Sequence, residues 1–317
     1  MGVAAEAAST LFADRVALIT GGARGIGLAL ARHLAGRGAR VVVMDNGASI
    51  DGRERDAQAP AAAADALGDQ AMVVDADVGD AQAVAAVMDR IATEHGRLDI
   101  LIHAAAIMRD ALIAKIAPED FAEVLRVNLA GGLVVMRAGL PLLRRAAEAE
   151  DASGREPAVL NLVSSAAFYG NVGVAAYAAA KAGLMALTRV GALEFRRFGI
   201  RVNALMPFAA TRVTEAIPPV NPLLESYRAR ALTIPPETVA PVAAWLVSPF
   251  ARGITGQLVG VRGRRVFLMS QPRPVAEAIV GRTADEESVD RAARAAFAGR
   301  WTDLASDLEA FNLDPLI

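Results

Sequence analysis

Thr20-Gly21-Gly22-Ala23-Arg24-Gly25-Ile26-Gly27 is the stretch that decides the fold of this 317-residue chain. It follows a short apolar run at 16–20 and opens an amphipathic stretch at 26–37, so it joins a strand to a helix. Glycines there permit backbone angles that a Cβ forbids and let an anion approach the main chain, where the helix N-terminus offers free N–H groups. The turn predicts a dinucleotide pyrophosphate site formed by Gly21, Arg24, Gly25, Ile26 and Gly27.

Strand and helix signals alternate along the rest of the chain. Short apolar runs predict strands at 16–20, 40–45, 71–75, 98–103, 159–164, 201–206 and 257–261. Longer amphipathic stretches predict helices at 26–37, 81–94, 121–145, 175–198 and 238–246. The strands are continuously apolar, as in a sheet covered on both faces. We therefore expect an α/β fold: one Rossmann-like, doubly wound parallel sheet of about seven strands, with helices on both faces.

The remaining segments set the expected domain organisation. Residues 1–14 lack a basic stretch followed by an apolar core, so we expect a flexible N-terminal extension rather than a signal peptide. Residues 15–269 form the expected single catalytic domain, with a polar loop at 46–59 and a proline-rich flap at about 208–236. Residues 270–317 form a C-terminal extension with helical character.

Composition excludes several classes of function. The formal net charge is −2, which gives no electrostatic basis for a nucleic-acid partner. The chain has no cysteine and three scattered histidines, so neither disulfides nor a metal site is expected. No run of 18 or more apolar residues predicts a membrane span. We expect a cytoplasmic protein with a small-molecule substrate and no membrane partner.

Two acidic residues follow the second and third predicted strands. Asp45 lies about 20 residues beyond the glycines, where a carboxylate binds the adenosine ribose of NAD and repels the 2′-phosphate of NADP. Arg24 favours NADP instead, because a basic residue in this loop can bind the 2′-phosphate. Asp77, with Val78 beside it, can either accept a hydrogen bond from the adenine amino group or cap the next helix. NAD is the expected cofactor and NADP the alternative.

Tyr177 and Lys181 are four residues apart on a predicted helix, so both project from one face. An ammonium beside a phenol favours the tyrosinate, so we expect the pKa of Tyr177 to lie below 10. Such a tyrosine can exchange a proton with an alcohol or a carbonyl. Ser164 ends the fifth predicted strand, where its hydroxyl can hold the substrate oxygen.

The glycine turn, the strand-end serine and the Tyr-x-x-x-Lys segment, in this order, resemble the short-chain dehydrogenase/reductase superfamily over about residues 15–261. The resemblance implies that Ser164, Tyr177 and Lys181 are catalytic, that Lys181 also binds the nicotinamide ribose, and that Asn128 takes part in a proton relay. It further implies cofactor contacts from Ala104, Pro207 and Thr211 (or Thr214), and a homodimer or homotetramer packed through the helices that carry Asn128 and Tyr177. Smaller matches, such as FYGNVGVAAY, are similar to the (3R)-hydroxyacyl-CoA dehydrogenase unit of multifunctional β-oxidation enzymes and to related bacterial enzymes.

The chain departs from the family pattern after the fourth strand. Where the family has Asn-Asn-Ala-Gly, this chain has His103-Ala104-Ala105-Ala106. We interpret His103 as a core histidine, with a functional group as the alternative. Large apolar side chains near strand ends and the flap predict a largely apolar substrate wall formed by Met108, Phe168, Met206 and Phe208. Arg109 and Arg212 are either anion contacts or surface residues.

The leading hypothesis is an NAD-dependent dehydrogenase that interconverts a secondary alcohol and a ketone, on a 3-hydroxyacyl-CoA or a steroid-like, apolar hydroxy substrate. An NADP-dependent ketoreductase of the 3-oxoacyl type is the alternative within enzymes. A non-catalytic, NAD-binding regulatory protein is the alternative outside them, and the altered segment at 103–106 is what supports it.

Overall fold

A computed structural model of the chain describes residues 10–149, 156–217 and 221–317. Its centre is a sheet with the strand order β3-β2-β1-β4-β5-β6-β7-β8. Seven strands are parallel: β1 (Val16–Thr20), β2 (Arg40–Met44), β3 (Ala71–Val74), β4 (Ile100–His103), β5 (Ala158–Leu162), β6 (Arg201–Phe208) and β7 (Leu258–Arg262). The eighth, β8 (Arg265–Leu268), pairs antiparallel with β7. The predicted α/β class and doubly wound sheet are confirmed, and β8 is an additional strand after the tight turn at 263–264.

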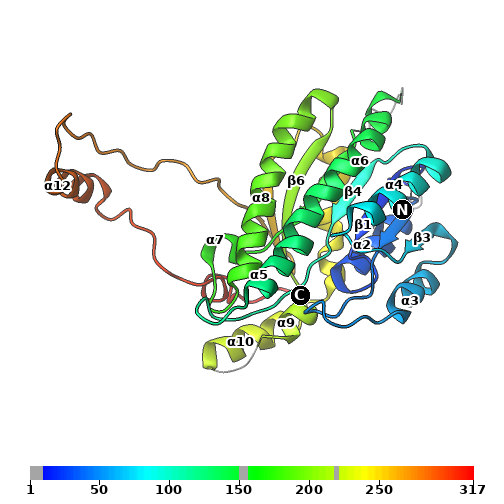
Figure 1. Cartoon of the computed structure of the whole chain (residues 1–317), viewed down its shortest axis with the longest axis horizontal. Coiled ribbons are helices and arrows are strands. Elements are labelled where there is room, and N and C mark those ends of the chain that lie inside the picture. Colours follow the sequence, from blue (N-terminus) through cyan, green and yellow to red (C-terminus); the bar gives the residue numbers. More distant parts are fainter. Residues whose placement is uncertain (1–9, 150–155, 218–220) are drawn as a thin grey trace.

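Helices cover both faces of the sheet (Figure 1). One face carries α4 (Ala81–His95), α5 (Pro118–Leu125), α6 (Gly131–Glu148) and α8 (Ala175–Phe195), and the other carries α2 (Gly25–Ala35) and α11 (Ala240–Val247). α3 (Gln58–Leu67), which was not predicted and whose first two residues fall in the predicted loop at 46–59, packs against β3 and α2. β1, β2, β4, β5 and β6 each bury side chains in both of two apolar clusters, which explains their continuous hydrophobicity.

The helix predicted at 121–145 is longer and contains an irregularity. A π-helical turn, Arg126–Ala130, joins α5 to α6. By length and composition, Pro118–Glu148 could cross a membrane. In this fold it contacts α4, β4 and α8, which is the packing of a core helix in the helical layer.

The flap at 208–236 is partly helical. α9 (Arg212–Glu215) is followed by α10 (Pro222–Ala231), in which Asn221 caps the N-terminus and Pro222 takes the first helical position, where its missing N–H costs nothing. The structure describes neither 218–220 nor 1–9, so most of the predicted N-terminal extension lies outside the described residues. Residues 10–14 form a turn in which Phe12 is completely buried and joins the apolar core, whereas Thr10 and Asp14 are exposed.

The C-terminal extension leaves the sheet after β8 and comes back to it. Figure 1 shows the segment around α12 (Glu286–Phe297) projecting far from the body before the chain returns. A last helix, α13 (Asp307–Ala310), then packs against α10 and against α7 (Ala166–Tyr169), which follows β5. The extension is thus helical only in part, and its final turn lies beside the carboxyl ends of the strands.

Candidate active site

The glycine turn between β1 and α2 has the backbone geometry of an anion cradle. Gly21 and Gly25 have φ of +66° and +53°, in the region that a Cβ disfavours. A Cβ at Gly27 would lie 2.1 Å from the carbonyl oxygen of Gly21, so only glycine permits this approach of helix to turn. No side chain caps the N-terminus of α2, whose N–H groups therefore stay available to an anion.

Asp45 ties the turn to the loop that follows β2. Its Oδ2 accepts a hydrogen bond from the backbone N–H of Ala23 (2.9 Å) and its Oδ1 from that of Gly47 (2.8 Å). The Arg24 guanidinium donates to the Gly47 carbonyl (3.2 Å) and to Asp56 (3.1 Å). Asp45 therefore both shapes the turn and presents a carboxylate to the cavity beside it.

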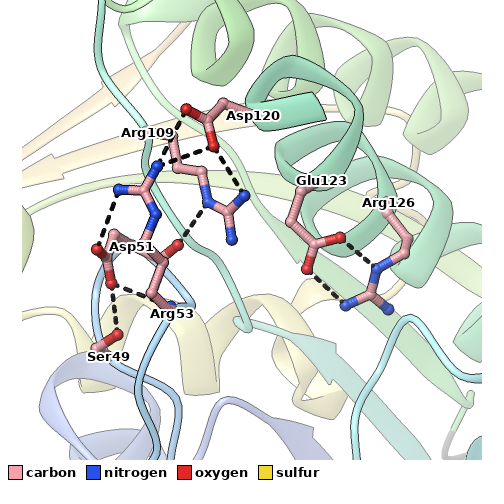
Figure 2. A network of polar contacts seen from close by, with 7 residues as sticks. All are labelled: Ser49, Asp51, Arg53, Arg109, Asp120, Glu123 and Arg126. Carbon is pink, nitrogen blue, oxygen red and sulfur yellow. Dashed lines mark hydrogen bonds and ion pairs between the residues drawn. The ribbon is translucent and has the colours of Figure 1, made fainter. Parts of the chain in front are cut away.

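The polar loop after β2 is anchored to α5 by an ion-pair network (Figure 2). Asp120 pairs with Arg53 (3.0 Å) and with Arg109 (2.9 Å), and Arg109 also donates to the carbonyl of Asp51 (2.7 Å). Asp51 in turn accepts from the Ser49 hydroxyl (2.5 Å), which helps to lower its pKa. Arg109 is thus a structural partner of this loop, and the sequence contained no pattern that paired these distant residues.

The third and fourth strands supply the next part of the cavity wall. Asp77 accepts from the Gly79 N–H (2.8 Å) and from the Arg126 guanidinium (2.8 Å), so it forms a turn while it lines the cavity. His103 is completely buried, and its Nδ1 lies 2.9 Å from the hydroxyl of Thr20. Burial and the nearby Lys181 lower the pKa of His103 to about 3, so the ring is neutral. The interpretation of His103 as a core residue agrees with this placement.

These elements enclose a cavity of about 690 Å³, which we name the glycine cleft. All thirteen residues that the sequence analysis proposed for cofactor binding line it: Gly21, Arg24, Gly25, Ile26, Gly27, Asp45, Asp77, Val78, Ala104, Tyr177, Lys181, Pro207 and Thr211. The cleft lies at the carboxyl ends of the strands, where β1 and β4 are neighbours and the strand order reverses. Open α/β sheets bind their ligands at such a switch point.

The proposed catalytic side chains meet at the end of the glycine cleft. Tyr177 and Lys181 lie on α8, and the ammonium of Lys181 is 5.7 Å from the centre of the Tyr177 ring. Lys181 is 2% exposed and donates to the carbonyl of Leu162 at the end of β5 (2.8 Å). Ser164, just beyond β5, hydrogen-bonds the Tyr177 side chain.

Asn128 lies in the π-helical turn that packs against α8. It is buried in the π-helical turn, where its Oδ1 accepts from the N–H of Ile107 and its Nδ2 donates to the carbonyl of the same residue, both at 2.8 Å. The side chain thus holds the segment after β4 against the helical layer. A proton-relay role for Asn128 stays a prediction.

The pKa of Tyr177 is raised, whereas the sequence predicted that it would be lowered. Burial raises it to about 12, and the charges of Asp110 and Asp307 add to the effect of burial, while the hydrogen bond with Ser164 opposes it. Burial also lowers the pKa of Lys181 to about 8. The expected lowering of the tyrosine pKa was wrong because desolvation of the phenol outweighs its polar contacts.

A second cavity of about 770 Å³, which we name the flap pocket, lies on the other side of Tyr177. It is lined by residues after β5, by the flap and by α13, including Ser164, Tyr177, Phe208, Leu224 and Asp307. Of the four predicted substrate residues, Met108 and Phe208 line it. Met206 is instead fully buried in the core beside β7, and Phe168 packs against the same apolar cluster.

Two acidic residues of the flap pocket escaped the sequence analysis. Asp110 lies seven residues beyond β4, and desolvation raises its pKa to about 6. Asp307 begins α13 and is 7% exposed. Asp110 lies in the stretch AAIMRDALI, which is similar to the hydroxyacyl-CoA dehydrogenase subgroup, but its side chain had no predicted role. Asp307 belongs to no motif, and only the fold brings it within reach of Ser165, 142 positions earlier in the chain. No group of three or more potential metal ligands occurs within the described ranges.

Comparisons with known proteins agree with this geometry. Residues 21–263 match the family model described as enoyl-(acyl carrier protein) reductase. A hydroxyacyl-CoA dehydrogenase, ChsB1, from Mycobacterium tuberculosis is 36% identical over 83% of this chain and 82% of its own length. Among solved structures, a short chain dehydrogenase from Mycobacterium avium has 31% identity and a TM-score of 0.74, covering 89% of this chain and 93% of the other. A 3-ketoacyl-(acyl-carrier-protein) reductase from Brucella melitensis, complexed with NADH, has 29% identity and a TM-score of 0.66, covering 79% and 97%.

The chain therefore belongs to the short-chain dehydrogenase/reductase family. It is an oxidoreductase of this type, whose relatives act on hydroxyl or keto groups with a nicotinamide cofactor.

Proposed function

We propose that this protein is an NAD(H)-dependent dehydrogenase that interconverts a largely apolar secondary alcohol, such as a 3-hydroxyacyl-CoA or a steroid-like compound, and its ketone. One observation carries the proposal: Tyr177 lines both the glycine cleft and the flap pocket. Its phenol therefore lies where a group held in one cavity meets a group held in the other. Ser164 and Lys181 flank it from β5 and α8.

In the proposed reaction, bound nicotinamide supplies the hydride acceptor for the carbinol C–H bond. The hydroxyl proton of the substrate passes to the Tyr177 phenolate, so the C–O single bond becomes a carbonyl as hydride and proton leave. Ser164 hydrogen-bonds the substrate oxygen. Lys181, in its protonated ammonium form, stabilises the negative charge of the phenolate. In the reductive direction Tyr177 returns the proton to the carbonyl oxygen.

The proposed preference for NAD rests on Asp45. Its carboxylate lines the glycine cleft after β2, where it would accept from a ribose diol and repel a 2′-phosphate. An NADP-dependent ketoreductase is the second candidate, because Arg24, Arg55 and Arg212 line the same cleft. These guanidinium groups are already engaged, with Asp56, Asp75 and the Ala48 carbonyl respectively, and this favours NAD.

The central experiment compares the wild-type protein with Tyr177→Phe on a panel of 3-hydroxyacyl thioesters and hydroxysteroids. General acid–base catalysis contributes about 10²- to 10⁴-fold, so we expect kcat to fall by that factor in the variant. Affinity for NADH, measured by fluorescence titration, is expected to stay within about threefold because the ring is kept. Tyr169→Phe, the same change at an exposed position, is the control.

Two outcomes would oppose the proposal. Equal turnover by Tyr177→Phe would remove the acid–base role. NADH binding without turnover of any compound would favour the non-catalytic, NAD-binding regulatory protein.

We further propose a cytoplasmic homodimer or homotetramer. Large apolar side chains are exposed on the helical layer that carries the site, namely Leu133 (50%) on α6 and Val190 (47%) and Leu193 (74%) on α8. Such a surface is suited to burial against a second copy. Leu193→Glu is expected to lower the mass measured by light scattering to that of a smaller assembly, and an unchanged mass would oppose this interface.

A further inference from the structure

The flap pocket contains a buried carboxylate that the proposed reaction does not use. Asp307 accepts a hydrogen bond from the Ser165 hydroxyl through Oδ2 (2.9 Å). Its other oxygen, Oδ1, is buried and has no hydrogen-bond partner within the described part of the chain. A buried carboxylate oxygen without a partner is costly, and such groups occur where a ligand supplies the missing donor.

Among the described residues, no cation compensates the charge of Asp307. Burial raises its pKa and the Ser165 hydroxyl opposes that shift, and no basic group contributes. The guanidinium of Arg262 lies over the rings of Phe208 and Tyr227 and donates to the carbonyl of Leu313, and it does not contribute to the pKa of Asp307. The carboxylate is therefore held in the pocket wall by packing and by neutral donors, the Ser165 hydroxyl and the backbone N–H groups at the start of α13.

Like Asp307 itself, the described lining of the flap pocket carries negative charge only. Three acidic residues line it, Asp110, Asp307 and Glu309, and among the residues that the structure describes no lysine, arginine or histidine does so. The glycine cleft differs in this respect, since both signs of charge line it: the cations Arg24, Arg55, Arg126, Lys181 and Arg212, and the acidic residues Asp45, Asp75, Asp77, Asp80 and Glu123. A cavity lined by one sign of charge concentrates ligands of the other sign and excludes ligands of its own.

We propose that, for the part of the substrate that it encloses, the flap pocket selects neutral or cationic groups over carboxylates, and that Asp307 accepts a hydrogen bond from a hydroxyl or ammonium group there, away from the reacting carbon. This inference rests on the proposed function, because it names the substrate class of the same site. The final helix of the C-terminal extension then acts as a specificity element: α13 brings the acceptor to a pocket whose other walls are mostly apolar.

The test uses three probes that share one ring: cyclohexanols with an aminomethyl, a hydroxymethyl or a carboxylate group at carbon 4, each as cis and trans isomers. Dissociation constants are measured by calorimetry at pH 8 on the whole protein, alone and saturated with NADH. Hydrogen bonds to charged groups are worth about 1.5–3 kcal/mol, or roughly 10- to 100-fold in affinity. We expect the aminomethyl and hydroxymethyl probes to bind more tightly than the carboxylate by this factor.

Three variants locate the effect. In Asp307→Asn the preference for the aminomethyl probe is expected to fall at least tenfold. Asp303→Asn makes the same change on an exposed residue of the extension and should keep it. Ser165→Ala removes the donor to Asp307 but leaves the charge, so it should also keep the preference, and it remains informative if Asp307→Asn does not fold.

The wild-type ranking tests the selectivity of the flap pocket, and Asp307→Asn tests the part of the proposal that names Asp307. The proposal is overturned if the carboxylate binds as well as the other probes, if no probe binds, or if a folded Asp307→Asn keeps the full preference. Binding requires no hydride transfer, so the two proposals can fail separately. A protein that shows the preference but oxidises no secondary alcohol contradicts only the dehydrogenase, and turnover without the preference contradicts only this inference.

Discussion

The glycine cleft and the flap pocket meet at Tyr177 but are built in different ways. The glycine cleft is formed mostly by strand ends and the turns directly after them, with Tyr177 and Lys181 of α8 at one end, so local sequence determines much of its shape. The flap pocket is assembled from the flap, the segment after β5 and α13, which are distant in the chain. The first cavity suits a cofactor that many enzymes share, whereas the second can change its ligand through loops and extensions.

The largest expected effect comes from a substitution that distorts the glycine cleft and leaves the flap pocket unchanged. In Gly27→Ala, the new Cβ would overlap the Gly21 carbonyl at 2.1 Å, so the turn must move. We expect NADH affinity to fall about 100-fold or more, since misplacement by 1 Å in a site can cost that factor. Fluorescence titration checks this. Gly281→Ala, where a Cβ meets nothing within 4 Å, is the control, and wild-type affinity in Gly27→Ala would contradict the cradle.

A smaller effect is expected when the same cleft keeps its shape but loses its charge. Asp45→Ala is expected to lower the ratio of kcat/KM for NAD to that for NADP roughly 10- to 100-fold, because a like-charge contact costs several kcal/mol. Asp45 also accepts two backbone hydrogen bonds. Asp45→Asn separates the two roles, since an amide keeps one acceptor without the charge. An unchanged ratio in both variants would remove Asp45 from cofactor selection.

Phe311→Ala would perturb the flap pocket and spare the glycine cleft. The Phe311 ring lies 4.7 Å from that of Phe208 and 5.5 Å from that of Tyr169, so it holds α13 in place. Loss of a buried phenylalanine costs about 3–5 kcal/mol, enough to undock a helix of one turn. We expect KM for the alcohol to rise on the order of tenfold with NADH affinity unchanged.

Steady-state kinetics and NADH titration check this prediction together. Phe250→Ala, on a 74% exposed side chain, is the control. A matching loss of NADH affinity in Phe311→Ala would show that the two cavities are not separate.

The smallest effect concerns pH. Oxidation requires the Tyr177 phenolate, and burial raises the pKa of Tyr177 to about 12, so the rate of oxidation should increase with pH above neutrality. The Asp110 charge contributes to that raised pKa. Asp110→Asn should therefore move the rising limb of the pH–rate profile to lower pH, by up to about one unit. Asp65→Asn, on exposed α3, should leave it in place, and a shift to higher pH in Asp110→Asn would contradict the sign.

The same contrast explains how far the sequence could predict the molecule. The strand at Val16–Thr20 was predicted with its observed bounds, and the residues proposed for the cofactor all line one cleft, because a glycine turn and strand ends are local features. α10 was assigned to a flap because its prolines obscured the Asn221 cap. Met206 was expected in the substrate wall but is fully buried, because near a strand end the sequence does not tell which face a side chain takes. Asp307 gave no signal, since its role depends on a contact with Ser165 that only the tertiary fold creates.

A crystal structure of the protein with NADH tests the central claim most directly. The account predicts the pyrophosphate at the N-terminus of α2, the adenosine ribose on Asp45, and the nicotinamide at the far end of the cleft, with its reactive carbon facing the Tyr177 hydroxyl and the flap pocket beyond. A nicotinamide bound away from Tyr177, or a Tyr177 hydroxyl turned out of the junction between the two cavities, would contradict it.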